Sequence, residues 1–485
     1  MARQTLIIVA ASVYFLAAIF NTGFYHPDEH FQLIEFAEYL SGHTSSIDLA
    51  WEFDAAIRPA LQPVVIKLLF DCCRWLSISD PYVLALMLRV VSAGSAVAVL
   101  TYYVARTEHL VPPNQLIYYR IFSYFLWFLP FVNVRFSSES ASGMLLTLAV
   151  AFCFSSHKLK FAFIGLCLGL AFSVRYQSAI IAIGLLIWLI AQKRIDKSGF
   201  AYLASGGLFV IIFTLFIDWF FYGQIVLPYL NYFTTNVIEN VASSFGTSPW
   251  SYYFVESYKS LTPIVSVPIF VALGFLLLRP QHVQFWIILP FLVIHMITPH
   301  KELRFLFPLV NFIPLLLMTQ LNDIATRISS LSKITINILP CLTVLIIVNV
   351  SIMVGSIFFP ADGIGRNNIT NYIHTKFGSE KVNLWIKGNK NPYEPIAVKQ
   401  NFYLDQNVQF HLLDTVKKIH LNSNCKNFVV GFENGIKQFQ GENPEYKVKE
   451  VISGVPNGLL MSRRFLGLSS STMVLCEISK VIGHE

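Results

Sequence analysis

Two adjacent acidic residues, Asp28 and Glu29, follow an apolar run that extends from Leu6 to near Phe20. Carboxylates that leave a membrane span together are costly in contact with lipid, so we expect them in an aqueous cleft. One carboxylate could take a proton from an attacking hydroxyl, which is general-base catalysis. The same residues also fit an ordinary solvated loop, and taken alone they favour that interpretation.

The residues after this acidic pair have helical spacing. Pro27 can occupy the first turn of a helix, where its missing N–H costs nothing. Gln32 and Glu35 then fall on the face of Asp28. We therefore predict one helix over residues 26–40, with Gln32 as a candidate substrate contact.

A second charged cluster, His300-Lys301-Glu302-Leu303-Arg304, follows Pro299. If Pro299 marks a helix start, His300 and Arg304 share a face, and the exposed backbone N–H groups with Lys301 and Arg304 form an anion site. The alternative is anchoring of basic residues at the membrane interface. Glu302 weakens that alternative, because a carboxylate gains nothing from anionic headgroups.

Further polar and aromatic residues accompany these two clusters in the expected outer loops and span ends. Arg135 and Glu139 stand four residues apart, which favours a simple ion pair at a span end over substrate contact. The aromatic residues could form an interfacial belt or a platform for a sugar or isoprenoid chain. The candidates for a substrate cleft are Gln32, Trp51, Glu52, Arg58, Arg135, Glu139, Tyr222 and Trp250.

Metal and redox chemistry is not expected. The seven cysteines are scattered and include no C-x-x-C spacing. The carboxylates near Asp28 are few and interleaved with aromatic residues, so we predict no metal and no cofactor. The 35 basic residues exceed the 28 acidic ones only modestly, which gives no reason to expect nucleic acid.

The elements that must position these residues are membrane spans. Of the 485 residues, 55% are hydrophobic and only 13% are charged, whereas about a quarter are charged in soluble domains. We therefore predict a polytopic α-helical membrane protein with about eleven spans. They lie near residues 4–20, 80–105, 116–133, 138–155, 161–174, 178–192, 201–218, 261–278, 284–298, 304–320 and 334–358.

Basic residues in the short loops set the predicted orientation, with the N-terminus cytoplasmic and the C-terminus outside. The outer side then holds a first loop, 21–79, and an aromatic loop, 219–260. Within the first loop, residues 64–76 could be a twelfth span. The recurrence of charges on one face favours an interfacial helix there.

The composition changes after Phe359, so we divide the chain into a membrane domain, 1–359, and a soluble domain, 360–485, on the outer side. Short apolar runs within it predict strands, and polar periodic segments predict helices. The strands are 382–386, 427–432 and 472–478, and the helices are 366–377 and 409–420. This pattern indicates a small α/β domain.

The motifs together resemble one family. HPDEHFQ, WEFDAAIR, DWFFYGQ, FGTSPWSYYF and HKELRFLFP occur in this order over about residues 20–315. The set is similar to glycosyltransferase family 22, the lipid-phosphate-mannose-dependent mannosyltransferases of asparagine-linked glycan and glycosylphosphatidylinositol (GPI) anchor synthesis. The first motif is most similar to the GPI branch. The soluble tail lacks the Cys-His motif of eukaryotic members, which points to a bacterial or divergent member.

The resemblance implies a GT-C membrane fold and inverting transfer of mannose from a polyprenyl phosphate donor to a lipid-linked glycan or glycolipid. It implies that Asp28 is the catalytic base with Glu29 as its partner, and that His300, Lys301 and Arg304 bind the donor phosphate. We expect a monomer in the bacterial inner membrane or the endoplasmic reticulum membrane. Transfer of another polyprenyl-linked sugar is one alternative, and a glycolipid transporter is another.

Overall fold

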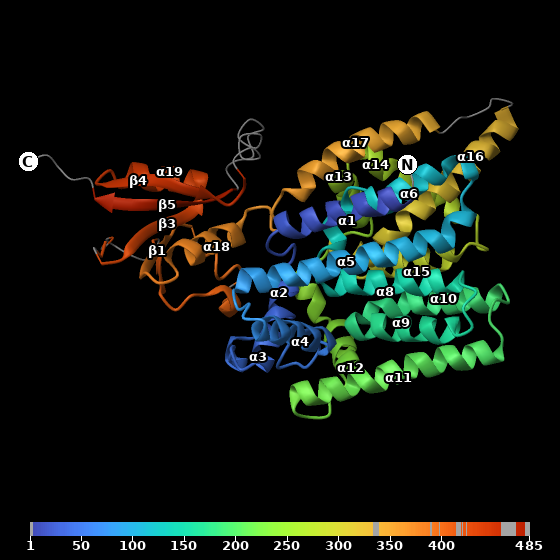
Figure 1. Ribbon diagram of the computed structural model, residues 1–485, viewed down its shortest axis with the longest axis horizontal. Coiled ribbons are helices and arrows are strands. Elements are labelled where there is room, and N and C mark those ends of the chain that lie inside the picture. The colour runs from blue at the N-terminus through green and yellow to red at the C-terminus, as the bar shows by residue number, and fades with distance from the viewer. Residues whose placement is uncertain are drawn as a thin grey trace, which may run out of the picture. The chain divides into compact units, whose positions relative to one another are not determined.

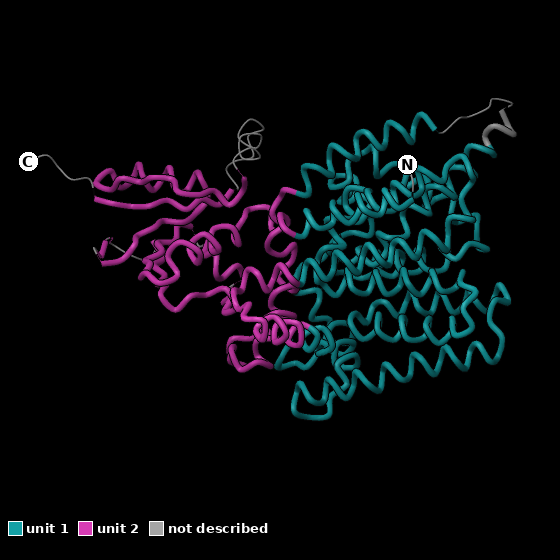
Figure 2. The backbone as a smooth tube through the Cα atoms, in the orientation of Figure 1, with its two compact units in different colours: residues 1–18, 51–65, 88–357 teal, residues 19–50, 66–87, 358–485 magenta. Residues whose placement is uncertain are grey.

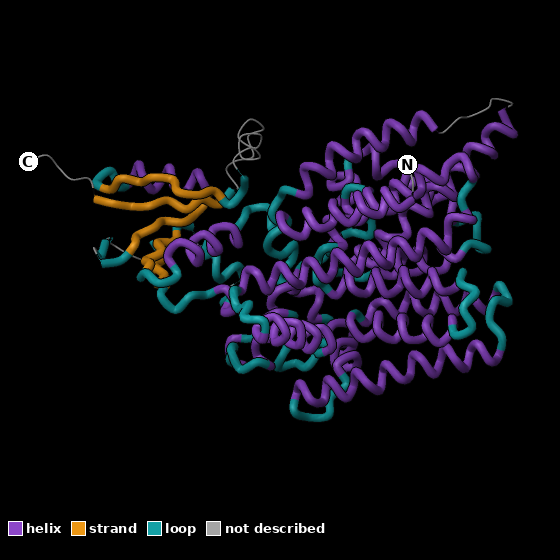
Figure 3. Tube along the Cα trace, viewed as in Figure 1, coloured by secondary structure: helices purple, strands orange, loops and turns teal. Residues whose placement is uncertain are grey.

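Helices dominate the computed structural model of the chain, and all strands among its described residues lie after residue 380 (Figures 1 and 3). The structure describes residues 3–332, 339–388, 390–396, 398–413, 419, 421–422, 424–456 and 472–480. The chain divides into two compact units (Figure 2). Unit 1 comprises residues 1–18, 51–65 and 88–357, and unit 2 comprises residues 19–50, 66–87 and 358–485.

The α-helices up to residue 357 and one long 3₁₀ helix overlap the predicted spans, two of which are divided between helices, and several shorter α-helices lie outside those spans. They are α1 (Arg3–Phe20), α2 (Asp28–Phe31), α3 (Ile34–Leu40), α4 (Leu61–Trp75), α5 (Pro81–Thr107), α6 (Leu116–Phe125), α7 (Phe128–Asn133), α8 (Ser138–Cys153), α9 (Lys160–Val174), α10 (Ala179–Ala191), α11 (Lys197–Tyr222), α12 (Pro228–Phe233), α13 (Tyr252–Leu261), α14 (Pro263–Leu276), α15 (Val283–Ile297), the 3₁₀ helix η7 (Leu303–Phe312), α16 (Ile313–Ser332) and α17 (Leu339–Ile357).

Five helical segments of the described chain are long and apolar enough to cross a membrane, and five shorter apolar helices accompany them. The long segments are Arg3–Phe20, Pro81–Leu110, Lys197–Tyr222, Leu303–Arg327 and Leu339–Ile357. This content confirms a polytopic helical membrane protein. The precise number of spans stays a prediction.

The predicted span at 116–133 is broken into α6 and α7. Asn349 of α17 accepts a hydrogen bond from the backbone N–H of Trp127 at 2.8 Å and donates one to the carbonyl of Phe125. Backbone groups in an apolar environment need partners, and this buried amide supplies them where the helix is interrupted. The break between the two helices is thus stabilised by a side chain from a distant helix, which hydropathy alone cannot detect.

Small residues allow α9 and α11 to pack closely. A Cβ added at Gly165 of α9 would lie 2.0 Å from the carbonyl oxygen of Leu203, and one added at Gly206 of α11 would lie 2.6 Å from that of Ala162. Such backbone approach is typical of membrane helix pairs, where apolar burial from water does not drive association.

Unit 2 contains a five-stranded sheet with the order β2-β1-β3-β5-β4. Its strands are β1 (Val382–Ile386), β2 (Val408–Leu412), β3 (Lys426–Phe432), β4 (Tyr446–Ser453) and β5 (Met473–Lys480). β2, β1 and β3 are parallel, whereas β5 runs antiparallel to β3 and β4. A small α/β fold therefore forms here, as predicted.

Two helices cover opposite faces of this sheet. Ile369 and Ile373 of α18 (Arg366–Phe377) pack in one cluster with Val382 and Leu384 of β1. The other face packs Trp385 in a separate cluster with residues of α19 (Glu433–Glu442). The alternation along β1 follows from the period-two geometry of a strand.

The predicted helix over 409–420 is wrong in its first part. Residues Val408–Leu412 form strand β2, in parallel register with β1. Residues 414–418 and 420 lie outside the described part of the chain. Pairing with β1, more than twenty residues earlier, decides this conformation, and such pairing overrides local preference.

Substitution Gly165→Ala should lower the stability of the detergent-solubilised protein by about 1–3 kcal/mol, because the new methyl group overlaps the carbonyl of Leu203. The neighbouring substitution Gly207→Ala is the matched control, since its Cβ would lie 3.6 Å from the nearest atom. Thermal unfolding of the two variants measures the difference. Equal melting temperatures would contradict the close packing.

Candidate active site

The acidic pair lies at the start of a short helix. α2 begins at Asp28 and ends at Phe31, with Pro27 as its N-cap residue. α3 starts only at Ile34, so the continuous helix predicted over 26–40 is interrupted at Gln32 and Leu33. Gln32 is buried. Both carboxylates stand in a first helical turn, where the helix dipole stabilises negative charge.

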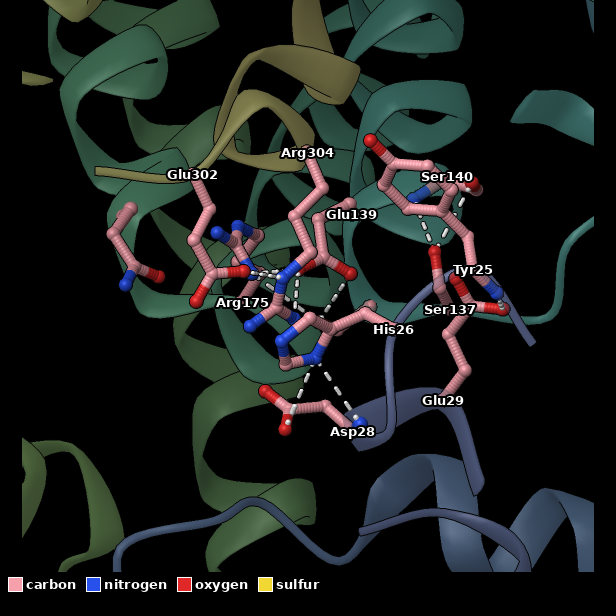
Figure 4. Close-up of polar contacts among 12 residues, drawn as sticks. Tyr25, His26, Asp28, Glu29, Ser137, Glu139, Ser140, Arg175, Glu302 and Arg304 are labelled. Carbon is pink, nitrogen blue, oxygen red and sulfur yellow. Dashed lines mark hydrogen bonds and ion pairs between the residues drawn. The ribbon is translucent and has the colours of Figure 1, made fainter. Parts of the chain in front are cut away.

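Asp28 and Glu29 are partly exposed and have different neighbours (Figure 4). The carboxylate of Asp28 lies 3.3 Å from Nδ1 of His26, which is also 3.3 Å from the backbone N–H of Asp28. Nδ1 accepts from that N–H when unprotonated and donates to the carboxylate when protonated. Glu29 instead accepts from the backbone N–H of Tyr25 at 3.3 Å.

Unit 1 contains a cluster of two carboxylates and two guanidinium groups, three of which are buried (Figure 4). Oε1 of Glu139 lies 2.8 Å from Nη1 of Arg175 and 2.9 Å from Nη1 of Arg304. Nε of Arg304 donates to Glu302 at 2.5 Å. Arg175, Arg304 and Glu139 are each less than 10% exposed, whereas the side chain of Glu302 is 24% exposed.

Charge within this arginine cluster, defined as Glu139, Arg175, Glu302 and Arg304, balances at two positive and two negative groups. Both guanidinium groups also lie over the ring of Phe305, at 5.4 Å for Arg175 and 5.3 Å for Arg304. Nε and Nη2 of Arg175 are buried and have no hydrogen-bond partner among the described residues. An unpaired buried donor costs about 1–3 kcal/mol, and more for a charged group.

Local features of α8 explain how this cluster forms. Ser137 caps the helix by accepting from the N–H of Ser140 at 3.1 Å, which fixes Glu139 in the first turn. A Cβ at Gly143 would lie 3.0 Å from Cα of Pro308, so this glycine allows η7 to approach α8. Arg304, on the first turn of η7, can then reach Glu139.

The segment before η7 differs from the prediction. No helix begins at Pro299, since the next one starts at Leu303. The ammonium of Lys301 donates to the carbonyls of Ser248 at 2.7 Å and Thr298 at 2.5 Å, with that of Pro299 at 3.4 Å. These carbonyls hold the segment in a loop, and burial lowers the pKa of Lys301.

This arrangement removes the expected helix N-terminus as an anion site and commits the three N–H bonds of Lys301 to the backbone. His300 contacts the carbonyl of Gly246 and the carboxylate of Glu302, each at 2.9 Å. A phosphate-binding role for His300 and Lys301 therefore stays a prediction. Of the three predicted phosphate residues, Arg304 belongs to the arginine cluster through its pairing with Glu139, and His300 contacts that cluster at Glu302.

Three other predicted residues, Glu52, Arg58 and Tyr222, lie together in unit 1. Arg58 pairs with Glu52 at 3.4 Å, and the hydroxyl of Tyr222 donates to the carbonyl of Arg58 at 2.7 Å. Asp218 accepts from the N–H of Ala60 at 2.8 Å. The end of α11 thus fixes residues 51–60.

The remaining candidates are more dispersed. Trp51 stacks on Phe245 with the ring centroids 6.3 Å apart, and Trp250 is 66% exposed. Arg135 is buried over the ring of Phe131 and lines a cavity of about 220 Å³ between α5 and α8. The other lining residues of this cavity are mostly aliphatic, Met144 among them.

The described residues contain no group of three or more His, Cys, Asp or Glu side chains that could hold a metal ion. The prediction of a metal-independent reaction stays a prediction.

Arg175 was not among the candidate site residues, although Arg175-Tyr176-Gln177 is one of the charged clusters that the sequence places at the outer ends of the spans. The available signal was a single arginine between two predicted spans, 161–174 and 178–192. An ionisable residue at such a position marks a functional site by default. Its partner Glu139 lies 36 residues away, and that distance hid the pair.

Comparisons with known proteins agree with this architecture. The sequence model described as the Alg9-like mannosyltransferase family matches residues 4–380. GPI mannosyltransferase 3 of Yarrowia lipolytica is 26% identical over 401 residues, 81% of this chain and 74% of the relative. GPI alpha-1,2-mannosyltransferase 3 of Bos taurus is 24% identical over 312 residues, 62% of this chain and 56% of the relative. The chain spans about half the length of several such relatives.

A solved structure supports the fold. The crystal structure of ArnT from Cupriavidus metallidurans bound to undecaprenyl phosphate is 11% identical and gives a TM-score of 0.51. The alignment covers 98% of this chain and 97% of ArnT. This likeness confirms the GT-C type of fold expected from the sequence motifs.

Substitution Glu139→Ala should destabilise the protein by about 3–5 kcal/mol, because it leaves two buried guanidinium groups without their shared carboxylate. Glu256→Ala is the control, since Glu256 pairs with the exposed Lys259, and such a surface pair contributes at most about 1 kcal/mol. Thermal unfolding in detergent measures both variants. A stable Glu139→Ala protein would show that this ion pair does not hold α8 to η7.

Proposed function

The chain belongs to the Alg9-like mannosyltransferase family, and from this membership we propose an inverting α-mannosyltransferase that uses a polyprenyl phosphate mannose donor. Its acceptor is a lipid-linked glycan or glycolipid. The observation that carries the proposal is the arginine cluster, in which Arg175 keeps two buried donors unpaired among the described residues.

A lipid phosphate supplies the acceptors that this cluster lacks. Guanidinium N–H groups match phosphate oxygens in geometry and charge. A phosphate that accepts from Nε and Nη2 of Arg175 converts an unfavourable burial into charge-assisted hydrogen bonds. Glu139 then keeps both guanidinium groups in place through their other nitrogens. The proposed phosphate site is therefore Arg175 with Arg304.

The transfer forms one bond and breaks another. The acceptor hydroxyl oxygen attacks the anomeric carbon of mannose as the bond from that carbon to the phosphate oxygen breaks. The phosphate leaves with the bonding electrons, and the two arginines stabilise the charge that develops on it. Attack from the face opposite the phosphate inverts a β-linked donor into an α-mannoside.

The proton of the attacking hydroxyl goes to Asp28 in this proposal. Asp28 is partly exposed, as a base that contacts the acceptor must be, and its carboxylate lies 3.3 Å from Nδ1 of His26. A general base of this kind contributes about 10²- to 10⁴-fold in rate. Glu29 is the partner of Asp28 in the acidic pair. Its carboxylate accepts from the N–H of Tyr25 and so stabilises the loop that carries both residues.

The names of the relatives support a proposal for the acceptor. Those from Yarrowia lipolytica and Bos taurus are named for GPI mannosyl transfer, and another from Schizosaccharomyces pombe is named for alpha-1,6 transfer to a dolichyl-linked glycan. We propose a lipid-linked glycan of the GPI type as the acceptor. Residues 51–58 with Tyr222 and Trp250 form its contact surface.

We further propose that the enzyme acts as a monomer without a metal ion or cofactor and does not bind nucleic acid. The N-terminus is cytoplasmic and the soluble α/β part lies on the opposite side, in the inner membrane of a bacterium or the endoplasmic reticulum of a eukaryote.

Substitution Asp28→Asn should reduce transfer by about 10²-fold or more, because the amide cannot take the hydroxyl proton. The assay follows radiolabelled mannose from polyprenyl phosphate mannose into a lipid extract, with polyprenyl phosphate glucose, galactose and arabinose as competing donors. Glu256→Gln, at an exposed ion pair, is the control. Activity of Asp28→Asn near that of the wild type would overturn the base assignment. Preference for another sugar would overturn the mannose assignment.

Substitution Arg175→Lys should raise the KM for the lipid phosphate donor by about 10-fold or more, because lysine keeps a charge but loses the planar set of donors. Arg120→Lys, which alters another arginine ion pair, is the matched control. Steady-state kinetics at several donor concentrations measure the effect. An unchanged donor KM for Arg175→Lys would place the phosphate elsewhere.

A further inference from the structure

We propose that the 3₁₀ helix η8 (Asn401–Tyr403), from the soluble part of the chain, positions the acidic loop that carries Asp28 and Glu29. Its Phe402 and Tyr403 contact His30 and Glu35, and we call these contacts the η8 clamp. The catalytic consequence rests on the proposed function, whereas the clamp is a property of unit 2 alone.

Glu35 is the centre of this clamp. Its side chain is fully buried, and its Oε1 accepts from the backbone N–H of Phe402 at 3.1 Å and faces Nε2 of His30 at 2.9 Å. Its Oε2 accepts from the hydroxyl of Thr44 at 3.1 Å. A carboxylate in such a place needs every one of these donors. Loss of Phe402 from its position therefore disturbs α3 directly.

His30 transmits the position of η8 to α2. His30 is the residue after Glu29 on that short helix and is 1% exposed. Its ring stacks on Tyr403, with centroids 5.3 Å apart and planes at 17°. Nε2 of the same ring lies within hydrogen-bond distance of Oε1 of Glu35. His30, the residue next to the acidic pair, thus stacks one face of its ring on Tyr403 of η8 and directs Nε2 at the edge of the ring toward Glu35 of α3.

Residues 66–87 hold η8 from another side. The ring of Phe70 stacks on Phe402 at 5.4 Å, and that of Tyr82 stacks on Tyr403 at 4.7 Å. His374 of α18 links Asp80 at 3.3 Å with Asp405 at 2.9 Å, just after η8. These contacts tie η8 to α18, a helix that covers the sheet, so the clamp has a rigid support.

The residues before the acidic loop are fixed to the same part of the chain. Thr22 accepts from the N–H of Ala361 at 2.9 Å through its carbonyl and donates its hydroxyl to Asn368 at 2.9 Å. Asn368 donates in turn to the carbonyl of Gly454 at 2.7 Å. The acidic loop is therefore held by the soluble part at its start and through α2 and α3 at its end.

Ordinary core packing would not need polar contacts of this kind. An apolar interface could hold two segments together with less demand on geometry, whereas Glu35 must meet three directional donors. Directional contacts fix a position within a fraction of an ångström, which is what a reacting group requires. We assign His30, Glu35 and Tyr403 as positioning residues, since they act through the acidic pair.

The test compares three variants of the full-length enzyme. Tyr403→Ala removes the ring that stacks on His30, and kcat should fall by about 10- to 100-fold. Donor KM should stay within about twofold, because the proposed phosphate site lies in unit 1. Tyr403→Phe keeps the ring and should retain most of the activity. Phe439→Ala, on the opposite face of the sheet, is the control for loss of a buried ring.

Hydrogen–deuterium exchange provides a readout that does not depend on catalysis. Tyr403→Ala should increase amide exchange in residues 26–33, whereas Phe439→Ala should leave exchange there unchanged. Equal kcat values for these two variants, corrected for the folded fraction, would overturn the positioning role. If the wild type transfers no mannose but Tyr403→Ala still increases exchange in residues 26–33, the proposed function is refuted and the clamp is retained. Unchanged exchange would refute the clamp.

Discussion

Buried carboxylates need a full set of donors, and this requirement organises both units of the chain. Glu139 meets it with two guanidinium groups, and Glu35 meets it with a histidine, a hydroxyl and a backbone N–H. An unpaired charge at either place is too costly to retain. Each carboxylate therefore joins segments that are distant in sequence, and each lies beside a part of the chain to which we assign chemistry.

Glu139 and Glu35 differ in whether their hydrogen-bond partners keep further donors for a ligand. Glu139 occupies one nitrogen of Arg175 and leaves two others for a ligand. Glu35 is surrounded by contacts of the protein itself, which suits a fixed support. We interpret the first as part of a binding surface and the second as part of a scaffold. The same physical rule thus separates a substrate contact from a positioning contact.

Much of the fold follows from local sequence patterns. Hydropathy located the membrane helices. The bounds of α18 and β1 coincide with the predicted ones because Gly365 and Gly378 flank α18 and β1 is a short apolar run followed by Gly388. The family resemblance, now confirmed, came from the order of short motifs. In the candidate site, the pairing of Glu52 with Arg58 lies within one such motif.

Contacts between distant residues explain what the sequence did not predict. The loop at Lys301 and strand β2 are set by partners outside their own segment. Arg175 lacked any local sign of its partner. Local patterns describe what a segment prefers, and these segments adopt what their partners require.

The separation between Glu35 and Phe402 has a consequence for biosynthesis. The two residues are 367 positions apart, so ribosomal synthesis at about 5–20 residues per second delays their contact by tens of seconds. Segments of the helical unit can assemble in that interval, while the acidic loop still lacks its carbonyl and amide partners. The contact that completes the first loop thus forms long after the loop itself has been made, so our proposal implies that the acidic pair becomes ordered only after residue 402 has been synthesised.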